Sequence, residues 1–264
     1  MRLTVVGCAG SFPGPDSPAS CYLVEAEDDA RTWRLLLDLG NGALGPLQRL
    51  LDPRHLDAVL LSHLHPDHCL DLCGLFVLLR HHPQGPPSTK LPVFGPAGTL
   101  DRLCLAYGGP DGEPDLGVVF DVREWDDGQA VRLGPVLITP FRVEHPVETY
   151  GLRLEHAGRA LAYTGDTDTC PALLGLARGA DLFLAEASFQ EGRDITRGVH
   201  LTGLRAGQVA TAAGARRLVL THVPVWTDPD VVLAEARSAF AGPVDLASPG
   251  GSYHLHPEAA AGRA

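Results

Sequence analysis

Leu61-Ser62-His63-Leu64-His65-Pro66-Asp67-His68 is the most informative stretch of this chain, and it directly follows the apolar run Ala58-Val59-Leu60. Three histidines and one aspartate therefore fall within six positions at the end of a predicted strand. Imidazole and carboxylate together suit zinc or a similar first-row metal ion. Because side chains alternate along an extended backbone, His63 and His65 point the same way, whereas Asp67 and His68 follow the turn and face a second point. This one segment is predicted to serve two metal ions.

The length and the charge of the chain restrict what it can do. With 264 residues, of which 45% are hydrophobic, the chain can bury a sizeable core. It carries 21 Lys and Arg against 32 Asp and Glu, a formal net charge of −11. An extended grip on nucleic acid needs a basic face, so this balance argues against it. The acidic balance does not exclude a local basic pocket that binds a single phosphate.

The cysteines and the apolar segments indicate the compartment. Six cysteines are scattered along the chain without the pattern of a disulfide framework. Cys69 and Cys73 lie four positions apart on a predicted helix, and we expect them to pack beneath the metal loop rather than to bind metal. Residues 1–7 are too short for a signal-peptide core and are predicted to form a strand. No apolar run approaches the roughly 20 residues of a membrane helix. We expect a reduced, cytoplasmic enzyme with no membrane association.

Strands and helices follow one another in two similar halves. Strands are predicted at 3–6, 21–25, 34–38, 59–61, 93–94, 118–122, 131–133, 136–143, 150–155, 159–163, 181–185 and 218–221. Helices are predicted after residue 42 through residue 50, and at 67–80, 99–107, 202–213 and 228–242. The pattern predicts an α/β (α+β) fold, a four-layer αββα sandwich with helices outside two facing mixed sheets. We expect a single domain over residues 1–264, with 249–264 as a frayed tail.

Three further metal-competent side chains each follow a predicted strand. His145, Asp166 and His222 come directly after strand-like stretches. Strand ends gathered on one rim of a rigid scaffold can build a site. Asp38 and Glu186 are additional carboxylates that could fix the tautomers of ligand histidines.

Several stretches resemble the metallo-β-lactamase fold superfamily, and specifically its ribonuclease Z-like branch. They are His63-Leu64-His65-Pro66-Asp67-His68, His145 before Tyr150-Gly151-Leu152, Tyr163-Thr164-Gly165-Asp166-Thr167, and Leu220-Thr221-His222. The resemblance implies an αββα fold with two divalent metal ions, zinc or alternatively manganese. One ion would bind His63, His65 and His145, the other would bind Asp67, His68 and His222, and Asp166 would bridge them. Two dications about 3.5–4 Å apart can hold a bridging hydroxide. Asp38 would support the ligands rather than bind metal.

His200 is the residue that best distinguishes between the possible substrate classes. In the ribonuclease Z-like branch, a histidine at the matching place faces the scissile phosphate and helps the leaving oxygen to depart. The predicted helix beginning at Thr202 offers free N–H groups and partial positive charge, which suit a phosphate. The alternative is an exposed loop histidine with no role. Asp67 and His200 are the residues to which we assign catalytic roles.

Other stretches resemble the bacterial cyclic-nucleotide phosphodiesterases of the atypical class II type. They are Gly14-Pro15-Asp16-Ser17-Pro18-Ala19-Ser20, Gly42-Ala43-Leu44-Gly45, Cys69-Leu70-Asp71-Leu72-Cys73-Gly74-Leu75-Phe76 and Leu220-Thr221-His222-Val223-Pro224-Val225-Trp226-Thr227. This resemblance implies a small phosphodiester substrate, a 3′,5′-cyclic nucleotide such as cyclic AMP.

Two alternatives stay open. One is a ribonuclease Z-like endonuclease that processes RNA 3′ ends, although the interval between Asp166 and His200 has no room for a long RNA-gripping arm. The other is a non-catalytic metal-binding protein. The oligomeric state, including a homodimer, is not readable from the sequence.

Overall fold

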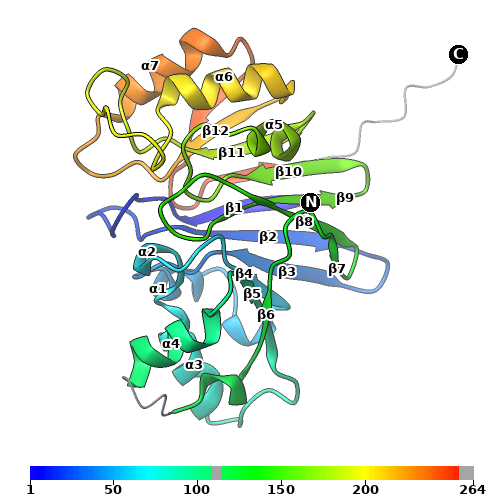
Figure 1. Cartoon of the computed structure of the whole chain (residues 1–264). Helices are drawn as coiled ribbons and strands as arrows, with labels where there is room; N and C mark the ends of the chain where they lie inside the picture. Colours follow the sequence, from blue (N-terminus) through cyan, green and yellow to red (C-terminus); the bar gives the residue numbers. More distant parts are fainter. Residues whose placement is uncertain (109–113, 256–264) are drawn as a thin grey trace, which may run out of the picture.

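Two mixed sheets of seven strands lie face to face, and helices cover the outer face of each (Figure 1). The computed structural model describes residues 1–108 and 114–255. The predicted four-layer αββα arrangement is therefore confirmed. In Figure 1, α1 to α4 lie below the first sheet and α5 to α7 lie above the second.

The first sheet runs in the order β14-β1-β2-β3-β4-β5-β6, and the second in the order β13-β12-β11-β10-β9-β8-β7. The strands of the first sheet are β1 Arg2–Gly7, β2 Cys21–Glu27, β3 Thr32–Leu37, β4 Ala58–Leu60, β5 Leu91–Gly95, β6 Phe120–Glu124 and β14 Ser252–His254. Those of the second are β7 Val131–Leu133, β8 Val136–Arg142, β9 Tyr150–His156, β10 Arg159–Tyr163, β11 Leu182–Glu186, β12 Leu218–Thr221 and β13 Val244–Leu246. The α-helices are α1 Leu44–Leu47, α2 Pro66–Cys69, α3 Leu72–His81, α4 Thr99–Gly108, α5 Ala172–Ala177, α6 Gly203–Ala213 and α7 Pro229–Ala239.

Three apolar layers hold the sandwich together. The central layer lies between the sheets and includes Leu37, Tyr163 and Leu184. A second layer packs the first sheet against its helices, and a third packs the second sheet against α5, α6 and α7. Strand β4, Ala-Val-Leu, is buried at every position, because one face meets the central layer and the other meets the helices.

Parallel pairing brings several strand ends to one rim of the sandwich. Strands β3, β4 and β5 pair in parallel, and so do β10, β11 and β12. Their carboxyl ends therefore point the same way within each sheet. The loops that leave β3, β4, β10, β11 and β12 meet there, and they carry the polar residues singled out in the sequence.

The helix boundaries follow from their end residues. The Thr202 hydroxyl accepts a hydrogen bond from the Arg205 N–H, as a helix N-cap does. Gly214, at φ 67°, ends the same helix in the left-handed conformation that glycine adopts readily. Asp228 caps α7 ahead of Pro229. These three boundaries confirm the sequence prediction.

Some predicted elements are wrong in extent. The helix predicted over 67–80 is divided into α2 and α3 around Asp71, whose carboxylate accepts from the Leu44 N–H. The helix predicted through residue 50 is shortened to α1, and residues 116–118 form a 3₁₀ turn before β6.

The predicted tail is also wrong in part. Residues 252–254 form β14, which pairs with β1. Residues 256–264 lie outside the described part of the chain. Within that part, no helix combines the length and the apolar character needed to cross a membrane.

Candidate metal centre

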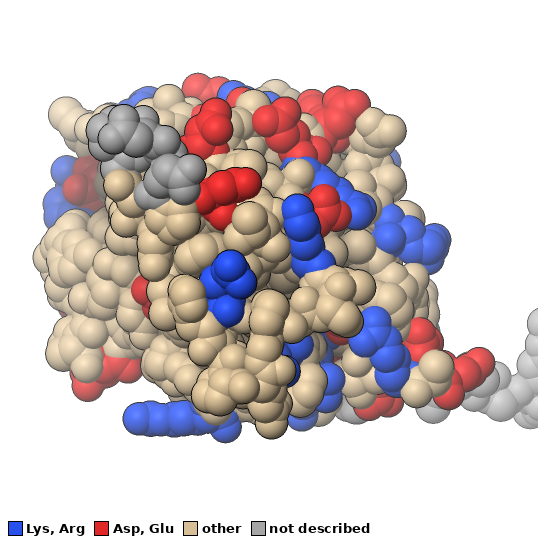
Figure 2. Space-filling view, turned by 90° about the horizontal axis from the view of Figure 1, so that it is seen from below, with Lys and Arg blue, Asp and Glu red and all other residues tan. Residues whose placement is uncertain are grey.

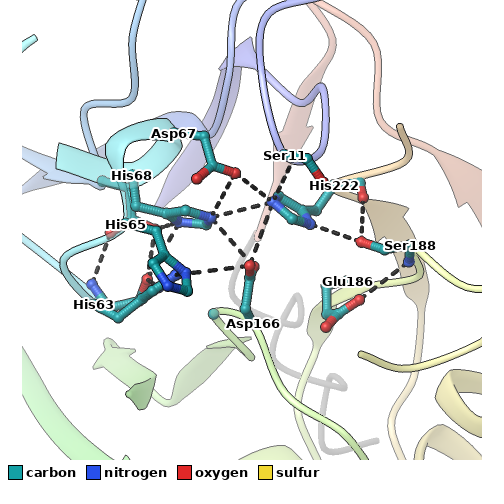
Figure 3. A network of polar contacts seen from close by, with 12 residues as sticks. Ser11, His63, His65, Asp67, His68, Asp166, Glu186, Ser188 and His222 are labelled. Carbon is teal, nitrogen blue, oxygen red and sulfur yellow. Dashed lines mark hydrogen bonds and ion pairs between the residues drawn. The ribbon is translucent and has the colours of Figure 1, made fainter. Parts of the chain in front are cut away.

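All seven sequence-predicted ligands meet at the rim where the strand ends gather. Figure 3 shows this site and labels every one of them except His145. The first four leave β4: His63 and His65 lie in the loop, and Asp67 and His68 lie on α2. The other three come from the second half of the chain. His145 lies between β8 and β9, Asp166 follows β10, and His222 follows β12.

The first group of donors comprises His63, His65, His145 and Asp166, with ligand atoms all within 4.8 Å of one another. His65 Nδ1 is 3.0 Å from His63 Nε2 and 3.3 Å from His145 Nε2. His63 is fully buried, whereas His65 and His145 are half-buried and reach the surface side of the site.

The second group comprises Asp67, His68, Asp166 and His222, and its ligand atoms satisfy the same 4.8 Å limit. His222 Nε2 lies 3.2 Å from His68 Nε2 and 3.0 Å from Asp67 Oδ2. All four side chains are buried.

Asp166 belongs to both groups. Its Oδ2 is 3.7 Å from His63 Nε2 and 3.5 Å from His222 Nε2, and its Oδ1 is 3.2 Å from His68 Nε2. One carboxylate thus lies between the two sets of imidazoles, the position that a bridging ligand would need. That these seven residues bind metal stays a prediction.

The backbone around the site is bent tightly to bring the donors together. Asp38 and His222 each adopt φ 56°, a conformation uncommon for non-glycine residues and concentrated at functional sites. Pro66 begins α2 directly after His65 and so fixes the turn inside the motif. Gly40 permits close approach, because a Cβ there would lie 1.9 Å from the Asp67 carbonyl oxygen.

His68, His145 and His222 each direct one ring nitrogen away from the centre to a partner. His68 Nδ1 lies 2.8 Å from Asp38 Oδ2, and His222 Nδ1 lies 2.8 Å from Ser188 Oγ. The Val199 carbonyl accepts from His145 Nδ1 at 2.8 Å. These contacts fix the tautomers, so that the other nitrogen of each ring faces the centre.

Asp38 accepts four hydrogen bonds that support the site. Its carboxylate accepts from the Ser62 N–H, the Ser62 hydroxyl, the Tyr163 hydroxyl and His68 Nδ1. It is fully buried. The interpretation of Asp38 as a supporting carboxylate rather than a ligand agrees with this geometry.

Burial and charge set the protonation of the donors. Burial lowers the pKa of His63, His65 and His145, and neighbouring imidazoles lower the pKa of His63 further. Burial would raise the pKa of Asp67 and Asp166, but hydrogen bonds and charges from His222 and His68 outweigh it and lower both. Burial also lowers the pKa of His68, but the carboxylates of Asp166 and Asp38 outweigh it and raise the pKa. The first group therefore offers neutral imidazoles beside an ionised carboxylate.

This arrangement fits a divalent metal ion. Pairs of ring nitrogens face each other at 3.0–3.3 Å, where two unprotonated nitrogens repel each other unless a proton or a metal ion lies between them. Asp166 Oδ1 is buried without a hydrogen bond, although His68 Nε2 lies 3.2 Å away. Cations placed among these donors would satisfy the facing nitrogens and the carboxylate together.

His200 lies beside the centre, between the two groups. Its ring centroid is 5.5 Å from that of His145 and 5.6 Å from that of His222. The Glu186 carboxylate lies 2.8 Å from His200 Nδ1 and also accepts from the Thr167 and Ser188 N–H groups. Burial lowers the pKa of His200, but Glu186 outweighs it and raises the pKa to about 9. Without a bound metal ion this pKa favours the protonated form of His200, whose Nδ1 faces Glu186.

Some site residues were missed in the sequence. Ser188 supports His222, and Ser62 bridges His63 and Asp38, but serine is too common for either position to stand out. Among the described residues, the groups able to hold a metal contain no cysteine, so Cys69 and Cys73 agree with the packing interpretation.

Comparison with known proteins adds an independent observation. The family model described as "Beta-lactamase superfamily domain" matches residues 33–223. A Mycobacterium leprae protein described as "Uncharacterized protein ML1173" is 48% identical over 97% of this chain and 89% of its own length. The "Ribonuclease Z" of Myxococcus xanthus is 32% identical over 97% of this chain and 98% of its own.

The Bacillus subtilis protein named "Probable metallo-hydrolase YhfI" is 32% identical over 95% of this chain and 98% of its own. Its crystal structure superimposes with a TM-score of 0.84 over 96% of this chain and 98% of its own, at 30% identity. Two further solved structures share the fold. A diphosphatase of the PhnP family superimposes with a TM-score of 0.73 at 20% identity, over 97% of this chain and 98% of its own. Unliganded yeast PDE1 superimposes with a TM-score of 0.70 at 15% identity, over 96% of this chain and 99% of its own.

Replacing Asp38 by alanine should destabilise the fold strongly. Four donors would lose a buried acceptor, and we expect the free energy of unfolding to fall by about 3–5 kcal/mol. Tyr163→Phe removes one of these donors and should cost about 1.5–3 kcal/mol. Urea unfolding in the presence of chelator measures both. The exposed Asp29→Ala is the control, and a cost for Asp38→Ala no larger than that of the control would contradict the network.

Proposed function

We propose that this chain, which belongs to the beta-lactamase superfamily, is a dinuclear-metal phosphodiesterase. One of its relatives is named as a probable metallo-hydrolase. Its substrate would be a small phosphodiester, and within that class a 3′,5′-cyclic nucleotide such as cyclic AMP. The observation that carries the proposal is His200, a buried imidazole held by Glu186 between the two groups of donors.

The seven donors would hold two divalent metal ions, with zinc as our first choice and manganese as the alternative. A donor set made up of imidazoles and carboxylates suits either ion. Bound ions would supply Lewis-acid polarisation of the phosphate and ionisation of the attacking water near neutral pH. The chain itself holds Asp67 and His222 in place through hydrogen bonds, and burial favours the neutral form of His63, His65 and His145.

His200 would donate a proton to the leaving oxygen. An alkoxide is a poor leaving group, so a proton donor near it accelerates bond cleavage. Glu186 occupies His200 Nδ1, which leaves the Nε2 proton as the one available to the substrate. The positive charge of His200 would also attract the phosphate. Carboxyl-ester substrates give this cation no comparable partner.

A ribonuclease Z-like activity on RNA is the second candidate, favoured by the 32% identity to the Myxococcus xanthus protein. Between Asp166 and His200 the chain forms α5, β11 and a loop, so this interval contains no long arm. The face in Figure 2 carries Lys and Arg side chains singly among neutral and acidic ones rather than as a continuous basic surface. The net charge of −11 also disfavours an extended RNA contact.

A non-catalytic metal-binding protein is the third candidate. Such a protein can lose a ligand without losing its role, yet all seven donors and His200 are present and converge here. This combination favours an enzyme.

Protein purified without chelator should contain about two equivalents of divalent metal per chain. Asp166→Ala removes the shared carboxylate and should lower the content of both ions, whereas Cys69→Ala should leave it nearly intact. Elemental analysis measures the content. A value near zero after reconstitution with zinc or manganese would refute the dinuclear site.

His200→Ala should lower kcat for cyclic AMP by about 10²–10⁴-fold, because general-acid help typically contributes this much. Its metal content should stay unchanged, whereas His63→Ala should lose metal as well as activity. A nitrophenyl phosphodiester, whose leaving group needs less protonation, should be affected less. Equal losses on both substrates would mean that His200 positions the phosphate instead of donating a proton.

Precursor transfer RNA should be cleaved poorly at physiological salt, because the interval between Asp166 and His200 contains no long arm and the net charge is −11. Gel analysis of a labelled precursor, alongside cyclic AMP and cyclic GMP assays of the same metallated sample, gives the comparison. Efficient cleavage at a single site on the 3′ side of the discriminator base would favour the ribonuclease Z-like activity instead.

A further inference from the structure

Two exposed aromatic side chains lie on the loops that reach His222 of the candidate metal centre. Phe12 and Trp226 are 39% and 59% exposed, and their ring centroids are 5.1 Å apart. Among the described residues, the other large exposed aromatic is Tyr107 on α4, whose ring packs against Phe76. Exposed apolar side chains that lie together indicate a binding surface more often than those that are scattered.

The loops that carry this aromatic pair also contact a predicted metal ligand. Phe12 follows Ser11, whose N–H donates to His222 Nε2 at 3.3 Å, and Figure 3 shows Ser11 beside the His222 ring. Trp226 lies four residues after His222 in the chain. The two loops approach closely, because a Cβ on Gly10 would lie 2.3 Å from the His222 carbonyl oxygen. The backbones of both loops therefore meet at His222.

Both loops are held in one conformation. The Phe12 N–H donates to the Gly10 carbonyl at 2.8 Å and closes a turn in which Ser11 adopts φ 65°. Such strained turns persist where the surroundings enforce them, and they cluster at functional sites. On the other loop, the Arg193 guanidinium donates to the Trp226 carbonyl at 3.5 Å, and the Thr227 N–H donates to the Pro224 carbonyl at 2.9 Å. The backbone that carries each ring is therefore held in place by hydrogen bonds.

We propose that Phe12 and Trp226 form a stacking platform for the base of a nucleotide whose phosphate reaches the metal centre. The proposal rests on the proposed phosphodiesterase function and specifies that its substrate is a nucleotide. Aromatic rings bind bases through the π-face that every base presents, so stacking alone accepts adenine and guanine alike. A purine offers more ring area than a pyrimidine, so cyclic AMP and cyclic GMP should both be preferred to cyclic CMP.

The test compares a nucleotide with a matched compound that lacks the base. Phe12→Ala and Trp226→Ala should each raise KM for cyclic AMP by about 5- to 150-fold, the range for one base–aromatic stack. KM for methyl riboside 3′,5′-cyclic phosphate should change far less, and Trp226→Phe should restore most of the affinity for cyclic AMP. Tyr107→Ala removes an exposed aromatic side chain elsewhere and serves as the control with unchanged kinetics.

A second measurement does not depend on turnover. Adenosine monophosphate added to the metallated protein should quench tryptophan fluorescence, and Trp226→Phe should lose this quenching while Trp33 and Trp125 remain. Quenching without any phosphodiester turnover would keep the platform and refute the proposed function. Turnover of a nitrophenyl phosphodiester without quenching would support the proposed function and refute the platform.

Other results would overturn the platform directly. Equal losses on the nucleotide and the base-free compound would mean that the aromatic pair only supports the loops. A change in oligomeric state for Phe12→Ala and Trp226→Ala, seen by sedimentation and without a change in KM, would instead assign the pair to an interface between protein chains.

Discussion

The buried carboxylate of Asp38 joins the two sheets at the point where the site is built. It leaves the end of β3 in the first sheet and accepts from the Tyr163 hydroxyl at the end of β10 in the second. The same carboxylate orients His68 and the Ser62 backbone that precedes His63. An ionised group inside a protein is tolerated only when its hydrogen-bonding capacity is filled. One set of hydrogen bonds therefore both orients the donors and connects the two sheets at this end of the apolar central layer.

The donors themselves impose a second constraint. Four of the seven come from one turn after β4, and the remaining three come from loops far away in the sequence. They meet because parallel pairing directs the ends of β10 and β12 to the same rim. Facing imidazole nitrogens and a shared carboxylate have poor alternatives to a cation, so metal binding at these residues would be linked thermodynamically to folding.

The convergence of the candidate donors could be predicted from the sequence better than their supporting contacts could. His63 stood out because three histidines and an aspartate fall within six positions, and Asp166 because it follows a strand in a chain that carries this cluster. Ser188 lies 34 residues from His222, and no local signal marks that pairing. Strands β13 and β14 were missed because three residues of ordinary composition become a strand only beside a neighbour. The division between α2 and α3 likewise depends on a tertiary contact, the Asp71 carboxylate on the Leu44 N–H.

The pairing of β14 with β1 has a consequence for the solution behaviour of the protein. Strand β1 reads Arg-Leu-Thr-Val-Val-Gly, and five of its six residues are buried. Without β14, its unpaired N–H and C=O groups would form an open, apolar sheet edge, the kind of surface on which other chains add strands and aggregate. Three residues near the carboxyl end thus act as a cover against self-association, although they lie far from any chemistry in the sequence.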